Sequence, residues 1–275
     1  REKDPRCLGI TARVALKAGQ WQRAVELMRQ KLGLHGDRRE KEEMVRDQND
    51  LALALSFLYR KEKDPTVLEK ARELLERVAR EYTDDCRWGD LVYVHRYRAC
   101  LELWAGKRAG AMEAIEGGLA FYREGSVKDM GPQGHLLLVR GQTEMAEGRD
   151  QEARDSFQGA AEAFQEYDYL VEEAVAHLWK ALASGGEEDR KEEEIESARQ
   201  ILQSFVEAHR EEQGRFAEMV RGREVRAGFL QEIGGEMTIC HRFSTMEAFF
   251  RDICERLESP SPKEVREILD ATVLL

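Results

Sequence analysis

The chain has 275 residues, of which 35% are charged, 8% are aromatic and only 5 are proline. This length allows one large domain or two of ordinary size, and the composition favours long solvated helices over a sheet-rich fold. Asp and Glu number 54 against 43 Lys and Arg, a formal net charge of −11. Such a surface repels phosphate, which disfavours nucleic acid as a partner.

The sequence contains no apolar run of about 18 residues and no basic segment followed by an apolar one, as in a signal peptide. The five cysteines are odd in number, scattered and free of any C-x-x-C pair, which fits reduced thiols better than a disulfide framework. We therefore expect a cytoplasmic protein in a reducing compartment, with no membrane partner. The chain opens with Arg1 and ends in the apolar run 271–275, so we expect a segment of a larger protein.

Helical periodicity predicts an all-α chain whose residues 1–210 form about five antiparallel helix pairs. Asp64 before Pro65 indicates a helix start, and Asp84 and Asp85 are expected to cap the helix that follows them. Gly131 with Pro132 indicates a helix boundary before the fourth pair. The expected helices cover 6–18 and 20–32, 42–60 and 65–82, 88–105 and 108–124, 131–147 and 150–167, and 170–184 and 188–210.

Residues 211–275 are predicted to be a cap for the last pair, with a possible linker to a further domain. The helical register weakens there, because Gly214, Gly222 and Gly228 each cost about 1 kcal/mol in a helix interior. Two short helices are expected near 245–257 and 263–270. A terminal repeat needs such a cover, because its apolar face has no next neighbour.

A repeated turn joins the predicted helices. Three pairs place a glycine five residues before an alanine, and two more keep an alanine in the second helix without the glycine. Glycine tolerates the positive φ of a helix C-cap, and alanine lets the second helix approach the first closely. These positions are Gly19 with Ala24, Gly106 with Ala111, Gly148 with Ala153, and then Ala71 and Ala198.

This pattern resembles the tetratricopeptide repeat (TPR) family, in a divergent form with long helices. Arg98 and Arg140 stand where the family has leucine, Glu102 and Glu144 where it has tyrosine, and the spacing exceeds the usual 34 residues. The resemblance implies a right-handed α-solenoid of antiparallel helix pairs, a TPR-like superhelix. It rests on Gly141, Gly148, Ala153, Phe157 and Ala160 in the fourth pair, Ala12, Gly19, Trp21 and Ala24 in the first, and Ala99, Gly106 and Ala111 in the third.

In the TPR family the first helix of each pair lines a concave groove that binds protein. The resemblance then implies a groove with cationic and aromatic side chains, suited to an acidic peptide, helix or domain. Some of these side chains, Tyr93 and Trp104 above all, would serve equally well as packing between helices. The family's carboxylate clamp is not reproduced. The implied groove residues are Arg13, Lys17, Tyr93, Arg96, Trp104, His135, Leu138, Gln142 and Met145.

Signals for chemistry are weak. The sequence has no phosphate-binding glycine loop, no serine-hydrolase elbow and no H-E-x-x-H motif. Cys240-His241 with Cys254 fits no familiar zinc module, and Cys100 with His95 or His135 does not share one helix face. The acidic run 187–194 is either a docking patch or a solvated helix start. We expect no catalytic residues, no cofactor and no metal.

The leading interpretation is a protein–protein interaction scaffold or regulatory domain of a larger intracellular signalling protein. The alternative is a ligand- or peptide-sensing module that controls an attached ATPase, protease or DNA-binding domain. An apolar pocket and a ligand-induced rise in melting temperature would favour sensing. An enzyme on a helical scaffold would need converging titratable groups, and an RNA binder would need a more basic groove.

Overall fold

The computed structural model describes residues 5–17, 19–34, 41–127, 131–221, 250–258 and 260–272, whose regular secondary structure is α-helix throughout. The chain divides into two compact units. Unit 1 runs to Tyr167 and unit 2 covers Asp168–Val273. Within the ranges given above, no helix is both long enough and apolar enough to cross a membrane.

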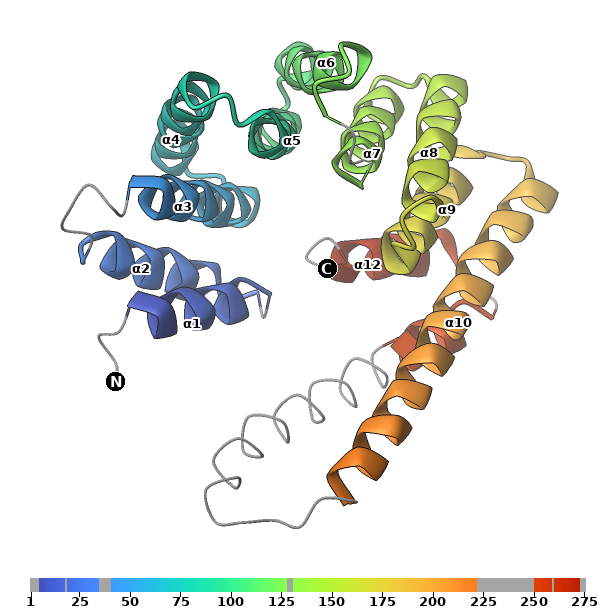
Figure 1. The fold of residues 1–275 in the computed structure, drawn as a ribbon. Helices are drawn as coiled ribbons and strands as arrows, with labels where there is room; N and C mark the ends of the chain where they lie inside the picture. The colour runs from blue at the N-terminus through green and yellow to red at the C-terminus, as the bar shows by residue number, and fades with distance from the viewer. Residues whose placement is uncertain are drawn as a thin grey trace. The chain divides into compact units, whose positions relative to one another are not determined.

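Unit 1 consists of four antiparallel helix pairs (Figure 1). Each pair joins two amphipathic helices through a turn of two or three residues, and most helix ends agree with the predicted ranges to within two residues. The pairs are α1 (Pro5–Lys17) with α2 (Trp21–Leu32), α3 (Lys41–Glu62) with α4 (Pro65–Asp84), α5 (Trp88–Trp104) with α6 (Arg108–Arg123), and α7 (Gly131–Ala146) with α8 (Asp150–Gln165).

The pairs stack in chain order. The second helix of one pair packs on the first helix of the next, α2 on α3, α4 on α5 and α6 on α7. The first helices also contact one another, α3 with α5 and α5 with α7. This arrangement places α3, α5 and α7 on one side of the stack, while α4 and α6 lie on the other (Figure 1).

The turns confirm the predicted role of glycine. Gly19, Gly106 and Gly148 have φ values of +70°, +74° and +74°, which lie in the left-handed region that favours glycine. In the second pair Lys63 takes this position with φ of +57°. A left-handed residue therefore ends the first helix in all four pairs of unit 1, although the sequence shows a glycine in only three.

The predicted N-terminal cap at Asp64 is confirmed, and the one predicted at Asp84 and Asp85 is wrong. Asp64 accepts a 2.8 Å hydrogen bond from the Thr66 amide, with Pro65 as the first residue of α4. Asp84 and Asp85 do not cap α5, which begins after Arg87 and has no side-chain cap there. They end α4 instead, because that helix continues through Asp84 with Asp85 as its C-cap.

Small residues bring the two helices of each pair together. Ala12, Ala99 and Gly141 occupy equivalent buried positions in α1, α5 and α7. A Cβ built on Gly141 would lie 2.5 Å from the Phe157 ring of α8. The repeated alanines of the second helices are buried as well, at Ala24, Ala71, Ala111 and Ala153.

Unit 2 is built from α9 (Leu170–Ala183), α10 (Glu188–Arg221), a helical segment at 250–256 and α12 (Pro262–Thr272). Ala198, the fifth repeated alanine, is buried between them. One apolar core joins α9 and α10 to Phe250, Ile253 and Leu257 and to the buried face of α12. The helix predicted to end at 210 continues to Arg221, through Gly214, so the predicted domain boundary at 210 falls inside α10. Cys240 and His241 lie outside the described residues.

Candidate functional site

Aligning the four turns of unit 1 places the predicted groove residues in rows. Positions are counted back from the residue with positive φ in each turn, which is Gly19, Lys63, Gly106 or Gly148. The row six positions back consists of Arg13, Phe57, Cys100 and Gln142. The row ten back consists of Leu53, Arg96 and Leu138, and the row thirteen back of Asp50, Tyr93 and His135. We call the surface formed by these rows, on α1, α3, α5 and α7, the first-helix face.

Arg13 is already engaged by a neighbouring helix. Its guanidinium donates to the Asp50 carboxylate of α3 from Nη2 at 2.9 Å and from Nε at 3.1 Å. Burial raises the pKa of Asp50, although the charge of Arg13 opposes this shift. The pair therefore offsets part of the charge of Arg13 at the α1 end of the first-helix face.

Trp104 belongs to an aromatic ladder that crosses three helices. The Trp21 and Phe57 rings stack with centroids 5.1 Å apart, and the Phe57 and Trp104 rings are 5.2 Å apart. Arg60 lies over the Trp104 ring at 5.3 Å, and Lys63 Nζ donates to the Trp104 carbonyl at 2.8 Å. Trp104 therefore packs between helices and is half-buried, with one cation over its ring and another at its backbone carbonyl.

Arg96 is the cation at the middle of the face. It lies half-buried on α5, 6.0 Å from the Tyr97 ring centroid. Burial raises the pKa of the Cys100 thiol and of the Tyr97 hydroxyl, and the positive charge of Arg96 opposes both shifts. Arg96 thus places a guanidinium among half-buried aromatic side chains, a setting that strengthens its interaction with an anion.

His135 lies on the α7 part of the face as a neutral packing residue. Its ring meets the edge of Phe164 with centroids 4.9 Å apart. Burial, and then the charge of Arg96, hold the pKa of His135 well below its ordinary value of 6.5. The imidazole is therefore uncharged at neutral pH.

Acidification is expected to destabilise the chain through His135. Because the folded pKa is depressed, the unfolded state takes up the proton first, so stability is lost as the pH falls below about 6.5. Between pH 7.5 and 5.5 the loss from this one group should be on the order of 1 kcal/mol. Urea unfolding of the chain and of His135→Leu at both pH values measures it. An equal pH dependence in the two proteins would contradict the assignment.

The remaining predicted groove residues are half-buried or not described. Tyr93, Leu138, Gln142 and Met145 are half-buried on α5 and α7. Lys17 is the last residue of α1, and its side chain lies outside the described atoms. The first-helix face thus brings Arg96 of α5 near His135 of α7, whose pKa its charge lowers, while Arg13 belongs to a separate ion pair.

Sequence reasoning missed Arg60. The second pair lacks the turn glycine, so its first helix could not be aligned with the others. The left-handed residue Lys63 stands where the other turns have glycine, so α3 can be aligned on it. Arg60 lies three residues before Lys63, as Leu103 and Met145 lie three residues before the turn glycines that follow α5 and α7.

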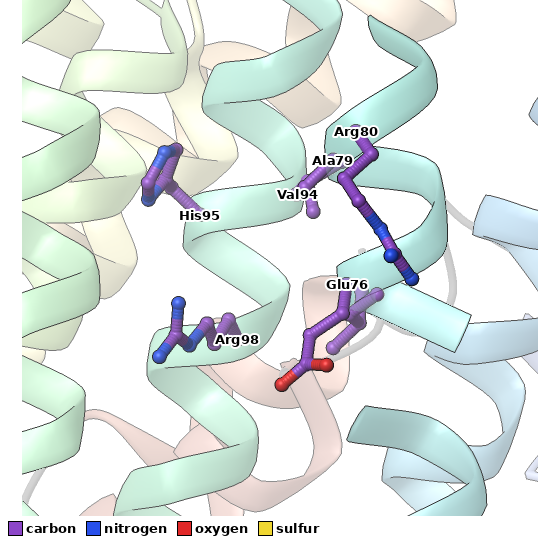
Figure 2. Close-up of a pocket in the computed structure, with 7 residues that line it drawn as sticks. Glu76, Ala79, Arg80, Val94, His95 and Arg98 are labelled. Carbon is purple, nitrogen blue, oxygen red and sulfur yellow. The ribbon is translucent and has the colours of Figure 1, made fainter. Parts of the chain in front are cut away.

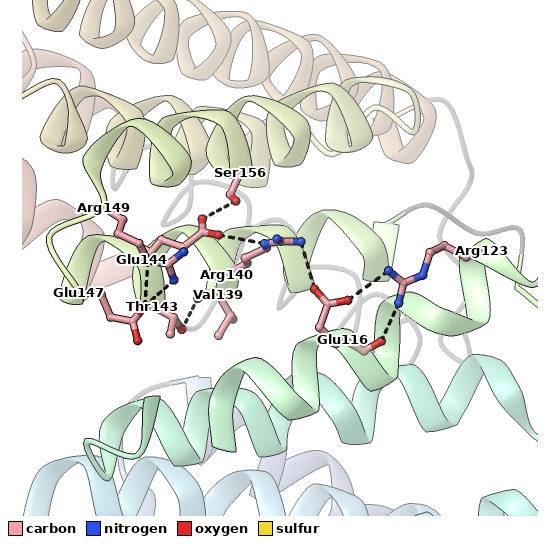
Figure 3. Close-up of polar contacts among 9 residues, drawn as sticks. All are labelled: Glu116, Arg123, Val139, Arg140, Thr143, Glu144, Glu147, Arg149 and Ser156. Atoms are coloured by element: carbon pink, nitrogen blue, oxygen red, sulfur yellow. Dashed lines mark hydrogen bonds and ion pairs between the residues drawn. The ribbon is translucent and has the colours of Figure 1, made fainter. Parts of the chain in front are cut away.

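The two glutamates that replace the family's tyrosine are buried in ion pairs. Glu102 accepts from Arg72 of α4 at both carboxylate oxygens, each at 2.7 Å. Glu144 accepts from Ser156 of α8 at 2.6 Å and from Arg140 at 3.0 Å (Figure 3). Arg140 also reaches Glu116 of α6 at 3.3 Å (Figure 3). Charged pairs therefore bridge successive helices, α4 to α5 and α6 to α7, at these positions.

A cleft of about 370 Å³ opens between α4 and α5 (Figure 2). Leu75, Ala79 and Val94 supply its apolar part, and Glu76, Arg80, His95 and Arg98 border it. His95 shares a 3.1 Å hydrogen bond between its Nδ1 and the Ala114 carbonyl of α6. Because a carbonyl only accepts, Nδ1 carries the proton.

The other candidate chemical groups have structural partners. His95 is directed to α6 and His135 to Phe164, and the raised pKa of Cys100 keeps its thiol protonated. In the acidic run, Glu194 is buried and bonds to His177 and Lys180, each at 2.6 Å. Among residues with described side chains, no three His, Cys, Asp or Glu side chains gather as metal ligands.

No family model and no curated protein matches the chain. Its fold is similar to that of a protein from Podosopora anserina whose crystal structure is described as a kinesin light chain with nearly identical TPR-like repeats. The two share 20% sequence identity and a TM-score of 0.50, over 73% of this chain and 96% of that one. The stacked helix pairs, their recurrent left-handed turns and this likeness identify the chain as a TPR-like α-solenoid.

Proposed function

We propose that the chain is a protein-interaction domain that binds an acidic peptide or helix on its first-helix face. The observation that carries the proposal is the setting of Arg96, which is half-buried near the Tyr97 ring on α5, the central helix of the face. Partly desolvated arginine and aromatic side chains are the residues that most often dominate binding energy at protein interfaces.

The charge distribution of the face supports an acidic partner. Arg60 over Trp104 and Arg96 near Tyr97 place two cations beside aromatic rings on adjacent helices, α3 and α5, which contact each other. Asp50 offsets the charge of Arg13 at one end. A carboxylate would therefore be bound near α5, in charge-assisted hydrogen bonds, with its neighbouring apolar groups against the rings.

Replacing Arg96 with glutamate is expected to weaken acidic-peptide binding at least tenfold, which corresponds to about 1.4 kcal/mol. A displayed library of 12-residue peptides is selected on the full chain, and the affinity of the best peptide is measured for Arg96→Glu. The control is Arg77→Glu, which makes the same charge change at an exposed position on α4. Arg13→Glu is avoided because it would set a second carboxylate beside Asp50. Equal loss in both variants would indicate general charge attraction and contradict the proposal.

The cleft between α4 and α5 supports a second candidate function, the sensing of a small ligand. Its volume of about 370 Å³ lies at the lower end of the range for small-molecule sites. A mixed library of apolar carboxylates would raise the melting temperature of the chain if the cleft is a site. Ala79→Leu, which fills the cleft, should abolish that rise. A rise that persists in Ala79→Leu, or no rise at all, would remove this candidate.

A further inference from the structure

The ring nitrogens of His135, on α7, differ in their bonding from those of two other histidines. His95 and His177 each bond through Nδ1, to a backbone carbonyl and to a carboxylate. The contact of the His135 ring is with the apolar ring of Phe164, and among residues with described side chains neither of its nitrogens has a hydrogen-bond partner. A half-buried imidazole of this kind has its hydrogen-bonding capacity left for a ligand.

Arg96 of α5 is the charge that acts on this ring. Burial and then the positive charge of Arg96 lower the pKa of His135, and no other charged group of the described residues, from α5, α6, α7 or α8, contributes. The helices α5 and α7 are in contact, and Arg96 is half-buried and bonds to no carboxylate among the described residues. A guanidinium and an imidazole, neither paired with a described anion, thus face the same region.

An anion between these two groups would change the state of the imidazole. In the free chain a proton on His135 is repelled by Arg96 and poorly solvated, because the ring is half-buried. A carboxylate bound to the guanidinium would offset that repulsion and favour the protonated ring, which donates from both nitrogens. The site therefore gains a second charged donor when the anion is present, with a proton taken from solvent.

We propose that Arg96 and His135 form one carboxylate subsite of the first-helix face, and that binding there is coupled to the uptake of a solvent proton by His135. This inference rests on the proposed function, since the carboxylate belongs to the acidic peptide. It adds a form of regulation, because the peptide then binds more tightly at acidic than at neutral pH. The same coupling makes the bound chain less sensitive to acid than the free chain.

Other titratable groups of the first-helix region respond differently to pH. Burial raises the pKa of Cys100 and of Tyr97, so both stay protonated at neutral and acidic pH. Asp50 of α3 also has a pKa raised by burial, and it is paired with Arg13. Asp50 is therefore the alternative acceptor of a proton, and the experiment has to separate it from His135.

The probe is a 12-residue acidic peptide selected on the full chain and free of histidine. Calorimetric titration at pH 7.5 and 5.5, in two buffers of different ionisation enthalpy, gives its affinity and the number of protons taken up. We expect binding roughly threefold or more tighter at pH 5.5, with net proton uptake. His135→Gln, which can donate but cannot titrate, should keep the affinity at pH 7.5 to within roughly threefold and lose both effects.

His95→Gln is the matched control. Burial lowers the pKa of His95 as well, but this side chain bonds to the Ala114 carbonyl of α6. The variant should therefore keep the tighter binding at pH 5.5 and the proton uptake. The melting temperature of each variant at both pH values checks that its fold is kept, and the measurement on the unchanged chain tests the coupling without any substitution.

Three results would overturn the inference. The first is an affinity that is equal at the two pH values, with no proton uptake. The second is uptake that persists in His135→Gln, which would assign the proton to Asp50. The third is an equal loss of uptake in His95→Gln, which would make it a property of the acidified fold and not of this subsite. The proposed function fails by a different result, an affinity at pH 7.5 that Arg96→Gln leaves unchanged.

Discussion

Replacing Glu102 with alanine is expected to lower the free energy of unfolding by about 3 kcal/mol, the low end of the cost of breaking a buried ion pair. Glu102 and Arg72 lie at the interface between α4 and α5, with only 9% and 16% of their side chains exposed. The change leaves the Arg72 guanidinium without the carboxylate that holds two of its nitrogens. Urea unfolding measures the loss.

Two further variants test that cause. Arg72→Leu together with Glu102→Leu should recover most of the stability, since no buried charge is left without a partner. Glu69→Gln removes the other carboxylate near Arg72. The Glu69 side chain is 63% exposed, so this change should lower the free energy of unfolding by less than about 1 kcal/mol. If Glu102→Ala proved no worse than Glu69→Gln, the buried pair would not stabilise the stack.

Replacing Gly141 with alanine is expected to cost about 2 kcal/mol, within the range for overpacking a filled core. The new Cβ would lie 2.5 Å from the Phe157 ring, and the ring is fully buried. Because α7 and α8 are in contact along their length, one of them has to shift. Urea unfolding, with circular dichroism to confirm helix content, measures the effect.

Gly159 provides the matched control on the partner helix. A Cβ built there meets only a Leu137 methyl group, at 3.4 Å. Gly159→Ala should therefore leave stability unchanged or raise it by up to about 1 kcal/mol, because alanine is the better helix former. A Gly141→Ala protein as stable as Gly159→Ala would show that the α7–α8 contact tolerates the extra carbon.

The helices of unit 1 could be predicted because their signals are local. A proline after Asp64 and glycines at Gly106 and Gly148 act within one turn of the chain, and the structure places helix ends beside all three. The end of α10 could not be predicted in the same way. Gly214 weakens a helix by about 1 kcal/mol, yet the helix continues through it to Arg221.

The candidate site was less predictable because its character depends on contacts between distant residues. Arg13 is a cation in the sequence, but Asp50, 37 residues away, is its ion-pair partner in the fold. Trp104 packs against Phe57 of another helix, which no spacing along α5 reveals. Arg96, by contrast, lies half-buried on α5 at the position that its register along the helix predicts. The binding role of these residues stays a prediction.

Hydrogen–deuterium exchange of the full chain with and without a selected acidic peptide is the most direct test of the proposed interaction site. The account predicts that amide protection increases in α5 and the facing parts of α3 and α7, and that this change is absent in Arg96→Glu. Protection confined to α4 and α6, or to unit 2, would place the ligand elsewhere and contradict binding at the first-helix face.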